Sequence, residues 1–320
     1  MFDIIIVGAG TAGMSAAIYA RRSGKSVLML EKTSYGGQII STPEVVNYPG
    51  IKNISGFDFA TGLYEQALAL DADLSYTHVI GIQKGCPEDP EGFTVLTSTE
   101  ELSCRAVILA TGAKNRPLGL QGEQELIGSG ISYCATCDGG FYRKKVVAVN
   151  GGGNTALEDA MYLSNLCNHV YLIHRRDTFR GEAALSEALA AKENVTFILN
   201  SEITALIPTY GSDIPGTNIR RTTLSSIFIR NRVTGEETAL NVDGLFIAIG
   251  QMPDNTAFSS LVNIDEKGYI IAGENCLTNV PGIFAAGDCR TKEVRQLTTA
   301  AADGAVSATA ACAYIDRNGR

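Results

Sequence analysis

The chain has 320 residues, of which 45% are hydrophobic and 19% charged, and its formal net charge is −8. This composition is that of a folded globular protein, and the length favours two domains that each bury a core. The acidic balance argues against nucleic acid as the main partner, because phosphate backbones are bound by basic surfaces. No apolar run reaches the ~20 residues that span a bilayer, and Met1-Phe2-Asp3 does not open a signal peptide, so we expect a cytoplasmic protein without membrane contact.

The first residues fit a strand, a glycine turn, a helix and a second strand, in that order. A strand over 3–7 runs into the turn Gly8-Ala9-Gly10-Thr11-Ala12-Gly13, which is followed by a helix over 14–23 and a strand over 26–30. Such glycines let the turn tighten and the backbone approach a pyrophosphate at the helix N-terminus. Glu31 lies 21 residues after Gly10, where an acid takes a free ribose 2′-hydroxyl. We therefore expect FAD or NAD here.

The same pattern recurs in the middle of the chain. A strand over 145–150 leads to the turn Gly151-Gly152-Gly153-Asn154-Thr155-Ala156, then to a helix over 157–167 and a strand over 170–173. This second strand ends in His174-Arg175-Arg176-Asp177-Thr178-Phe179-Arg180, with no acid at the place of Glu31. Guanidinium groups donate paired hydrogen bonds to phosphate, so the cluster predicts the 2′-phosphate of NADP(H) at this loop.

The second unit is predicted to be inserted into the first. Residues 114–117 are typical of a linker, a strand over 244–249 leads back, and a strand stopping at Gly287-Asp288 precedes a small-residue helix over 298–315. We therefore predict an α/β protein with two Rossmann-like dinucleotide-binding domains. The first domain comprises residues 1–113 and 245–320, and the second comprises residues 114–244.

Only two of the eight cysteines are spaced to react with each other. Cys134 and Cys137 are separated by two residues, so a disulfide can close between them and one thiolate can resolve a mixed disulfide formed by the other. A zinc site would need two more ligands, which the sequence does not supply, so we expect no metal. Asp138 follows the pair, and it is either an acid/base for thiol exchange or a cap of the next turn. The other six cysteines, expected to be buried and unpaired, are Cys86, Cys104, Cys167, Cys276, Cys289 and Cys312.

Taken together, these motifs resemble the low-molecular-weight thioredoxin reductases of the pyridine nucleotide-disulfide oxidoreductase class, over residues 3 to about 315. Five motifs occur in the order of that family: the first glycine turn, Gly36-Gly37-Gln38 with Asn47 and Pro49, Cys134-Ala135-Thr136-Cys137-Asp138, the second glycine turn with its arginines, and Gly287-Asp288 with Arg295-Gln296. The resemblance implies that NADPH reduces FAD, that FAD reduces the cysteine pair, and that the pair reduces thioredoxin. It also implies that Cys137 faces the flavin, that Cys134 attacks the partner and that Asp138 is the acid/base.

The cofactor-binding residues follow from the motifs and the resemblance together. Those expected to bind FAD are Gly8, Gly10, Thr11, Ala12, Gly13, Glu31, Gly37, Gln38, Asn47, Thr111, Gly112, Gly287, Asp288, Arg295 and Gln296. Those expected to bind NADPH are Gly151, Gly153, Asn154, Thr155, Ala156, His174, Arg175, Arg176 and Arg180. A homodimer is a further expectation from the resemblance.

One departure from the family bears on the partner protein. Family members commonly carry a bulky aromatic pair after Cys-Asp-Gly, whereas Gly140 stands here before the single Phe141. The acceptor is therefore either thioredoxin or a glutaredoxin-like small redox protein. The rival activities on the same fold, a flavin-dependent dithiol oxidase and a ferredoxin-fed disulfide reductase, are disfavoured by the intact arginine cluster.

Overall fold

The computed structural model describes residues 1–42, 44–213 and 220–319, and the chain forms two compact units. One unit comprises residues 1–114 and 252–320, and the other comprises residues 115–251. The predicted insertion of one α/β unit into another is therefore the observed topology. The chain passes between the units through β7 (Ala113–Asn115) and β16 (Gln251–Pro253), which pair with each other.

The second crossing lies at 251/252 rather than at the expected 244/245. The reason is the pairing of β15 (Gly244–Ile247), which continues the sheet of the inserted unit beside β9 (Val146–Asn150). A boundary at 245 would divide this strand from the sheet to which it is hydrogen-bonded.

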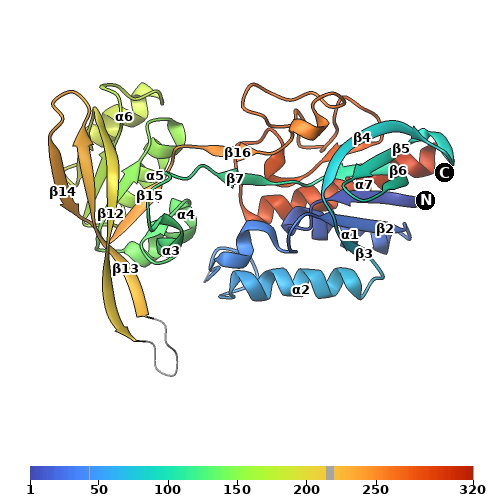
Figure 1. The fold of residues 1–320 in the computed structure, drawn as a ribbon, viewed down its shortest axis with the longest axis horizontal. Helices are drawn as coiled ribbons and strands as arrows, with labels where there is room; N and C mark the ends of the chain where they lie inside the picture. The colour runs from blue at the N-terminus through green and yellow to red at the C-terminus, as the bar shows by residue number, and fades with distance from the viewer. Residues whose placement is uncertain (43, 214–219, 320) are drawn as a thin grey trace. The chain divides into compact units, whose positions relative to one another are not determined.

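The first unit is built on a sheet in the order β3-β2-β1-β6-β5-β4, with β17 pairing to β6 (Figure 1). Its strands are β1 (Phe2–Val7), β2 (Val27–Glu31), β3 (Asp73–Tyr76), β4 (Val79–Cys86), β5 (Asp89–Thr97), β6 (Glu101–Leu109) and β17 (Ile283–Ala285), and its α-helices are α1 (Thr11–Arg22), α2 (Gly56–Leu68) and α7 (Leu297–Arg317). Pairing is parallel from β3 to β6 and antiparallel in the β4–β5–β6 meander.

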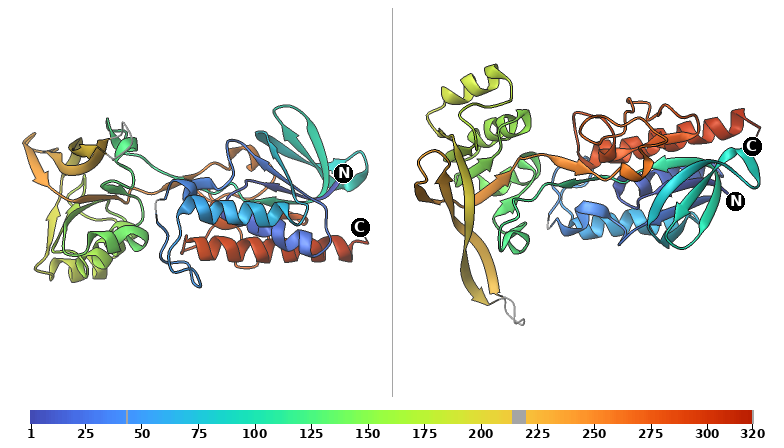
Figure 2. Two further views of the ribbon diagram at one scale, coloured as in Figure 1. Left: turned by 90° about the horizontal axis from the view of Figure 1, so that it is seen from below. Right: turned by 45° about the horizontal axis from the view of Figure 1, so that its top comes forward.

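Alternate residues of β1 point into two different cores. Ile4 and Ile6 pack with the helices, including α1 and α7, whereas Ile5 and Val7 pack with β4, β5 and the segment before β17. All four side chains are buried, which is why β1 is a continuous apolar run rather than an alternating one. The sheet is thus covered on both faces, with the three helices together on one of them (Figure 2).

The inserted unit has a parallel sheet in the order β11-β10-β9-β15-β8. Besides β9 and β15, its strands are β8 (Ile131–Ser132), β10 (His169–Ile173) and β11 (Val195–Ile198), and its helices are α3 (Glu123–Leu126), α4 (Ala135–Asp138), α5 (Asn154–Ser164) and α6 (Ala183–Ala190). Helices α5 and α6 cover one face. The antiparallel sheet of β12 (Ser201–Asp213), β13 (Arg220–Asn231) and β14 (Glu237–Asn241) covers the other.

Both nucleotide-loop helices begin earlier than the sequence pattern predicted. Helix α1 begins at Thr11 rather than at residue 14, and α5 begins at Asn154 rather than at residue 157. In each case the last residues of the glycine motif already have helical conformation. The glycine loops therefore lead directly into helix N-termini.

Two further expectations concern cysteines and membranes. Of the six single cysteines, all of which are described, five are free and buried as expected, but Cys86 is free and only half-buried. In the described part of the chain, no helix combines the length and the apolar character needed to cross a bilayer.

Candidate active site

The first glycine loop lies where β1 runs into α1. Gly8 adopts a positive φ of 107°, and a Cβ on it would lie 2.4 Å from the Ala110 carbonyl oxygen. A Cβ on Gly13 would lie 1.9 Å from the Gly8 carbonyl oxygen, so helix and strand pack as closely as the sequence predicted. By contrast, a Cβ on Gly10 would meet only the Gly37 Cα, at 4.0 Å, so packing does not require glycine there. The absence of a side chain at Gly10 instead keeps the helix N-terminus open to a pyrophosphate.

Glu31, at the end of β2, is hydrogen-bonded to this loop. One carboxylate oxygen accepts a hydrogen bond from the Ala9 amide at 2.9 Å, and the other accepts from the Thr33 amide at 3.0 Å. Helix α1 has no side-chain cap, since its N-cap residue is Gly10. The loop thus presents uncapped backbone amides beside a fixed carboxylate, which are the groups that a dinucleotide with a free ribose hydroxyl needs.

Other residues predicted to bind FAD lie in the same unit, and several of them form hydrogen bonds within it. Gln38 donates to the Ala113 carbonyl oxygen, and Asn47 donates to the Gln296 side chain at 3.2 Å. The Thr111 hydroxyl donates at 2.8 Å to Asn255, which is 1% exposed. Gln296 also caps α7, in a reciprocal capping box with Thr299. These contacts order polar side chains from η1 (Gly37–Ser41), the end of β6 and the start of α7.

Asp288 and Arg295 each carry a buried polar atom that no described group satisfies. These atoms are Oδ1 of Asp288 and Nε of Arg295. Burial raises the pKa of Asp288, and the Arg295 guanidinium lies 4.2 Å from the centre of the Tyr269 ring. Buried polar groups without partners are rare and need an explanation, such as a bound ligand. The residues of this unit therefore fit FAD, whose ribityl hydroxyls and pyrophosphate offer the missing donors and acceptors.

The second glycine loop has the same construction between β9 and α5. A Cβ on Gly151 would lie 2.4 Å from the Ala248 carbonyl oxygen, and one on Gly152 would lie 2.2 Å from the His174 ring. Gly153 has nothing within 4 Å of its Cβ position, and it precedes α5 without a side-chain cap. Asn154 is held at the start of α5 by hydrogen bonds with Glu182, at 2.8 and 3.1 Å.

His174 lies at the end of β10, directly over this loop. It is 4% exposed, its Nε2 has no partner in the described part of the chain, and its ring stacks on Phe179. Burial and then the positive charges of Arg180, Arg176 and Arg175 lower the pKa of His174, so the ring is neutral at pH 7. A neutral ring with a free nitrogen can exchange a hydrogen bond with a nucleotide without adding charge.

The three arginines that follow are exposed, and their side chains make no hydrogen bond or ion pair with the residues described. Their backbones, by contrast, form hydrogen bonds with neighbouring segments. Arg180 donates its amide to the Gly152 carbonyl oxygen at 2.7 Å, and the Arg175 carbonyl oxygen accepts from Arg232 at 3.4 Å. The segment is thus anchored to the glycine loop while its guanidinium groups stay available for a phosphate.

Cys134 and Cys137 form a disulfide around the first turn of α4. The S–S distance is 2.07 Å and the Cα atoms are 5.3 Å apart. Sγ of Cys134 accepts a hydrogen bond from the Cys137 amide at 3.2 Å, a contact that favours a thiolate on Cys134 once the bond is reduced. Both side chains are half-buried, and Thr136 between them is exposed. The pair therefore lies beside an exposed residue, where a partner could approach it for thiol–disulfide exchange.

Asp138 is half-buried and does not cap the turn that follows it. Its carboxylate accepts a hydrogen bond of 2.6 Å from the hydroxyl of Ser132, which is 3% exposed. Asp138 precedes η2 (Gly139–Tyr142) but makes no side-chain capping bond to it, so the structure does not support the alternative role as a cap. Burial raises the pKa of Asp138, and the Ser132 hydrogen bond lowers it only in part, so a proton is held more tightly than on an ordinary aspartate.

Sequence reasoning missed several polar residues that support these sites. Ser132 and Asn255 fix Asp138 and Thr111, and a buried cluster of Arg290, Lys292 and Asp303 lies beside Gly287. Asp303 alone carried a readable signal, because a charge within the small, mostly apolar residues of α7 is unusual for a helix that packs on a core. Ser132 and Asn255 gave none, since their importance depends on contacts distant in sequence.

Comparison with known proteins agrees with this geometry. A profile of the pyridine nucleotide-disulphide oxidoreductase family matches residues 2–304. The chain is 39% identical to a thioredoxin reductase of Listeria innocua, covering 99% of this chain and 94% of the relative. It is 40% identical to one from Treponema pallidum, with 98% and 97% covered. The crystal structure of thioredoxin reductase from Streptococcus pyogenes superposes with a TM-score of 0.89 at 37% identity, covering 99% of both chains.

The chain therefore belongs to the pyridine nucleotide-disulphide oxidoreductase family, a class that joins a nicotinamide cofactor, a flavin and a redox-active disulfide. Within that family, the relatives named above match along nearly the whole chain and are thioredoxin reductases, which use FAD and NADPH. The family and the fold class predicted from the motifs are both confirmed.

Proposed function

We propose that this chain is an NADPH-dependent, FAD-containing thioredoxin-disulfide reductase. The Cys134–Cys137 disulfide carries the proposal, since it is the group through which electrons leave the protein. The two glycine loops support it, one with a carboxylate at the end of the second strand and one with arginines there. Those arginines also favour NADPH over oxygen or ferredoxin as the counterpart of the flavin.

When bound, NADPH and FAD supply the two electrons that reduce the disulfide. Sγ of Cys134 then attacks the partner's disulfide, forming a mixed disulfide and releasing one partner thiolate. Sγ of Cys137 attacks Cys134 in that mixed disulfide, which restores the Cys134–Cys137 bond and releases the second partner thiolate. Asp138 holds the proton that a departing thiolate needs, and Ser132 orients its carboxylate.

The roles of the cofactor ligands extend the same proposal. The loop of Gly8 to Gly13 would hold the FAD pyrophosphate, with Glu31 at a ribose, and the residues around Asp288 and Gln296 would hold the ribityl chain. The loop of Gly151 to Ala156, with the cluster from His174 to Arg180, would hold NADPH.

The acceptor is proposed to be thioredoxin, as the names of the relatives indicate, with a glutaredoxin-like protein as the alternative. Phe141 is 46% exposed, and a Cβ on Gly140 would meet nothing within 4 Å. Packing within the chain therefore does not force glycine at 140, and the aromatic docking surface is reduced to one ring.

A homodimer is proposed from the family, and a cytoplasmic location is proposed from the unpaired cysteines, which persist in reducing compartments.

One anaerobic experiment tests the proposal. NADPH is added in slight excess to the yellow protein, flavin absorbance is followed, and oxidised thioredoxins and glutaredoxins are then added in turn. We expect bleaching by NADPH and reoxidation by one of these proteins. Cys134→Ser and Cys137→Ser should each abolish that reoxidation while keeping NADPH-to-dye electron transfer. Full turnover of the acceptor by either variant, or a flavin that NADPH leaves oxidised, would contradict the proposal.

A further inference from the structure

The loop between β17 and α7 contains a buried cluster of charged side chains. Arg290, which is fully buried, donates to both carboxylate oxygens of Asp303, from Nε and Nη2 at 2.8 Å each. Lys292 donates to Oδ2 of the same carboxylate at 2.9 Å, and its side chain is 4% exposed. The other acid in contact, Glu274, is 3.2 Å from Arg290 but has a side chain 90% exposed. One buried carboxylate thus balances two buried cations.

The same carboxylate reaches the backbone of the predicted flavin site. Oδ2 of Asp303 accepts a hydrogen bond from the Gly287 amide at 2.9 Å. Gly287 has a positive φ of 80°, and a Cβ on it would lie 2.8 Å from the Ala12 side chain in α1. Asp303, from the second turn of α7, therefore fixes the residue that begins the turn η4 (Gly287–Cys289) against the first glycine-loop helix.

The residue after Gly287 is Asp288, whose buried Oδ1 has no partner among the described residues. A buried acceptor left without a donor is destabilising, and more so when it is charged. The turn must hold this oxygen in place for a ligand to satisfy it. Burial alone would raise the pKa of Asp303, but hydrogen bonds from Arg290 and Lys292 keep it below its usual range, so the anchor stays ionised at neutral pH.

We propose that Asp303 is the positioning residue of the flavin site: through the Gly287 amide it holds the η4 turn, so that the free oxygen of Asp288 accepts a hydrogen bond from a hydroxyl of FAD. Arg290 and Lys292 keep the Asp303 carboxylate fixed and charged. The inference rests on the proposed function, because it takes Asp288 as an FAD ligand.

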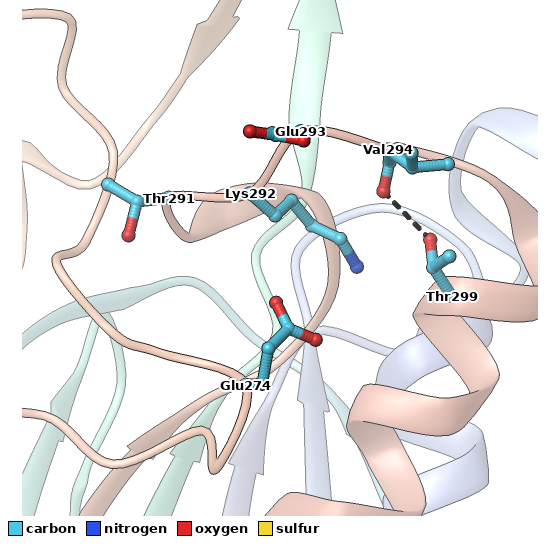
Figure 3. Close-up of a pocket in the computed structure, with 6 residues that line it drawn as sticks. All are labelled: Glu274, Thr291, Lys292, Glu293, Val294 and Thr299. Carbon is cyan, nitrogen blue, oxygen red and sulfur yellow. Dashed lines mark hydrogen bonds between the residues drawn. The ribbon is translucent and has the colours of Figure 1, made fainter.

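A cavity of about 620 Å³ borders the outer side of the cluster (Figure 3). It is lined by Glu274, Thr291, Lys292, Glu293, Val294 and Thr299. The Thr299 hydroxyl donates to the Val294 carbonyl oxygen at 3.0 Å, which ties its rim to α7. Because Lys292 borders this space, Lys292→Met removes one cation while keeping most of the length of the side chain, and the adjoining cavity leaves room for it to adjust.

The test is the affinity of the apo-protein for FAD, measured by flavin fluorescence during titration. Asp303→Asn and Asp288→Ala should each raise the Kd about tenfold to a hundredfold, as expected for one hydrogen bond to a charged group. The double variant should bind FAD within about threefold of the weaker single variant, because one residue acts through the other. Effects that multiply would overturn the proposal.

A second variant separates positioning from charge burial. The double variant Lys292→Met/Asp303→Asn removes one cation together with the anion. It therefore leaves less unpaired buried charge than Asp303→Asn alone. Positioning predicts FAD binding as weak as in Asp303→Asn, whereas recovery to the Kd of the unmodified protein would show that only charge balance matters. Circular dichroism of each apo-protein checks the fold, and unfolding of both variants would also overturn the proposal, since the cluster would then serve the fold itself.

Asp316→Asn is the matched control, because Asp316 is an exposed carboxylate on the same helix that pairs with Lys25. Its Kd for FAD should be unchanged. Failure of the unmodified apo-protein to take up FAD would contradict the proposed function instead, so the two failures are distinguishable.

Discussion

Three buried side-chain atoms lack a hydrogen-bond partner within the described residues: Nε2 of His174, Oδ1 of Asp288 and Nε of Arg295. His174 lies in the arginine cluster that predicts NADP(H), and Asp288 and Arg295 are FAD ligands by the family resemblance. A folded protein rarely leaves such groups unsatisfied, because each costs about 1–3 kcal/mol. The unsatisfied hydrogen-bonding capacity of these three atoms supports the proposal that their residues contact cofactors.

Asp138 is expected to supply the proton for thiol exchange. Asp138→Asn keeps the shape of the side chain and its contact with Ser132 but removes the proton that the carboxyl exchanges. We expect disulfide reduction to slow by about 10²-fold or more, the usual contribution of a general acid or base. NADPH-to-dye electron transfer should be unaffected, and stopped-flow reduction of thioredoxin measures the difference. Unchanged thioredoxin turnover would show that solvent supplies the proton.

Arg175 and Arg176 are expected to set the preference for NADPH over NADH. Replacing both by alanine should remove roughly 2–4 kcal/mol of hydrogen bonding to the 2′-phosphate, which lowers the NADPH/NADH preference by about 30-fold to 1000-fold. The ratio of kcat/KM for the two nucleotides gives the answer. Arg230→Ala is the control, because Arg230 is an arginine of the same unit that pairs with Glu237. A preference that stays intact would mean that the arginine cluster is only a solvated patch.

At the scale of elements, sequence predicted best where local chemistry decides. Both glycine turns with their flanking strands lie where expected, because a positive φ at Gly8 and close contacts at Gly13, Gly151 and Gly152 disfavour a side chain at those positions. The antiparallel sheet of β12, β13 and β14 was not predicted, since its strands cover the inserted unit through contacts between residues distant in sequence. The return crossing was placed too early for a related reason: the pairing of β15 with β9 cannot be read from β15 alone.

Helix α5 supplies a prediction of pH dependence through Asp159. Burial, with a smaller contribution from Glu158, raises the pKa of Asp159 to about 7. The folded state binds this proton more tightly than the unfolded chain does. The protonated carboxyl therefore contributes its full stabilisation below the unfolded pKa of 3.8, and this stabilisation is lost as pH rises through about 7. Asp159→Asn should therefore stabilise the protein increasingly between pH 4 and 7, by on the order of 2 kcal/mol at pH 8.

Thermal unfolding at pH 5 and pH 8 tests this sign. The Tm advantage of Asp159→Asn should be larger at pH 8 than at pH 5. Glu187→Gln serves as the control, because Glu187 lies exposed on the neighbouring helix α6. An advantage that is equal at both pH values would mean that Asp159 does not change its ionisation on folding.

At the scale of the whole molecule, each unit has its own pair of cores, one on each face of its sheet. The predicted FAD ligands all lie in the first unit, and the predicted NADPH ligands and the cysteine pair all lie in the inserted one. Each cofactor should therefore stabilise one unit directly. This division follows the order of the two glycine motifs, which lie on opposite sides of the first crossing between the units.

Calorimetry of the full chain checks this division. A ligand at about 100 times its Kd stabilises the state that binds it by about 2.7 kcal/mol. Removing FAD should lower the transition of the first unit and leave the other in place, whereas NADP⁺ should raise only the transition of the inserted unit. NAD⁺ at the same concentration should raise it less, because it lacks the phosphate that the arginines are expected to bind. One transition that both ligands shift equally would mean that the units unfold together.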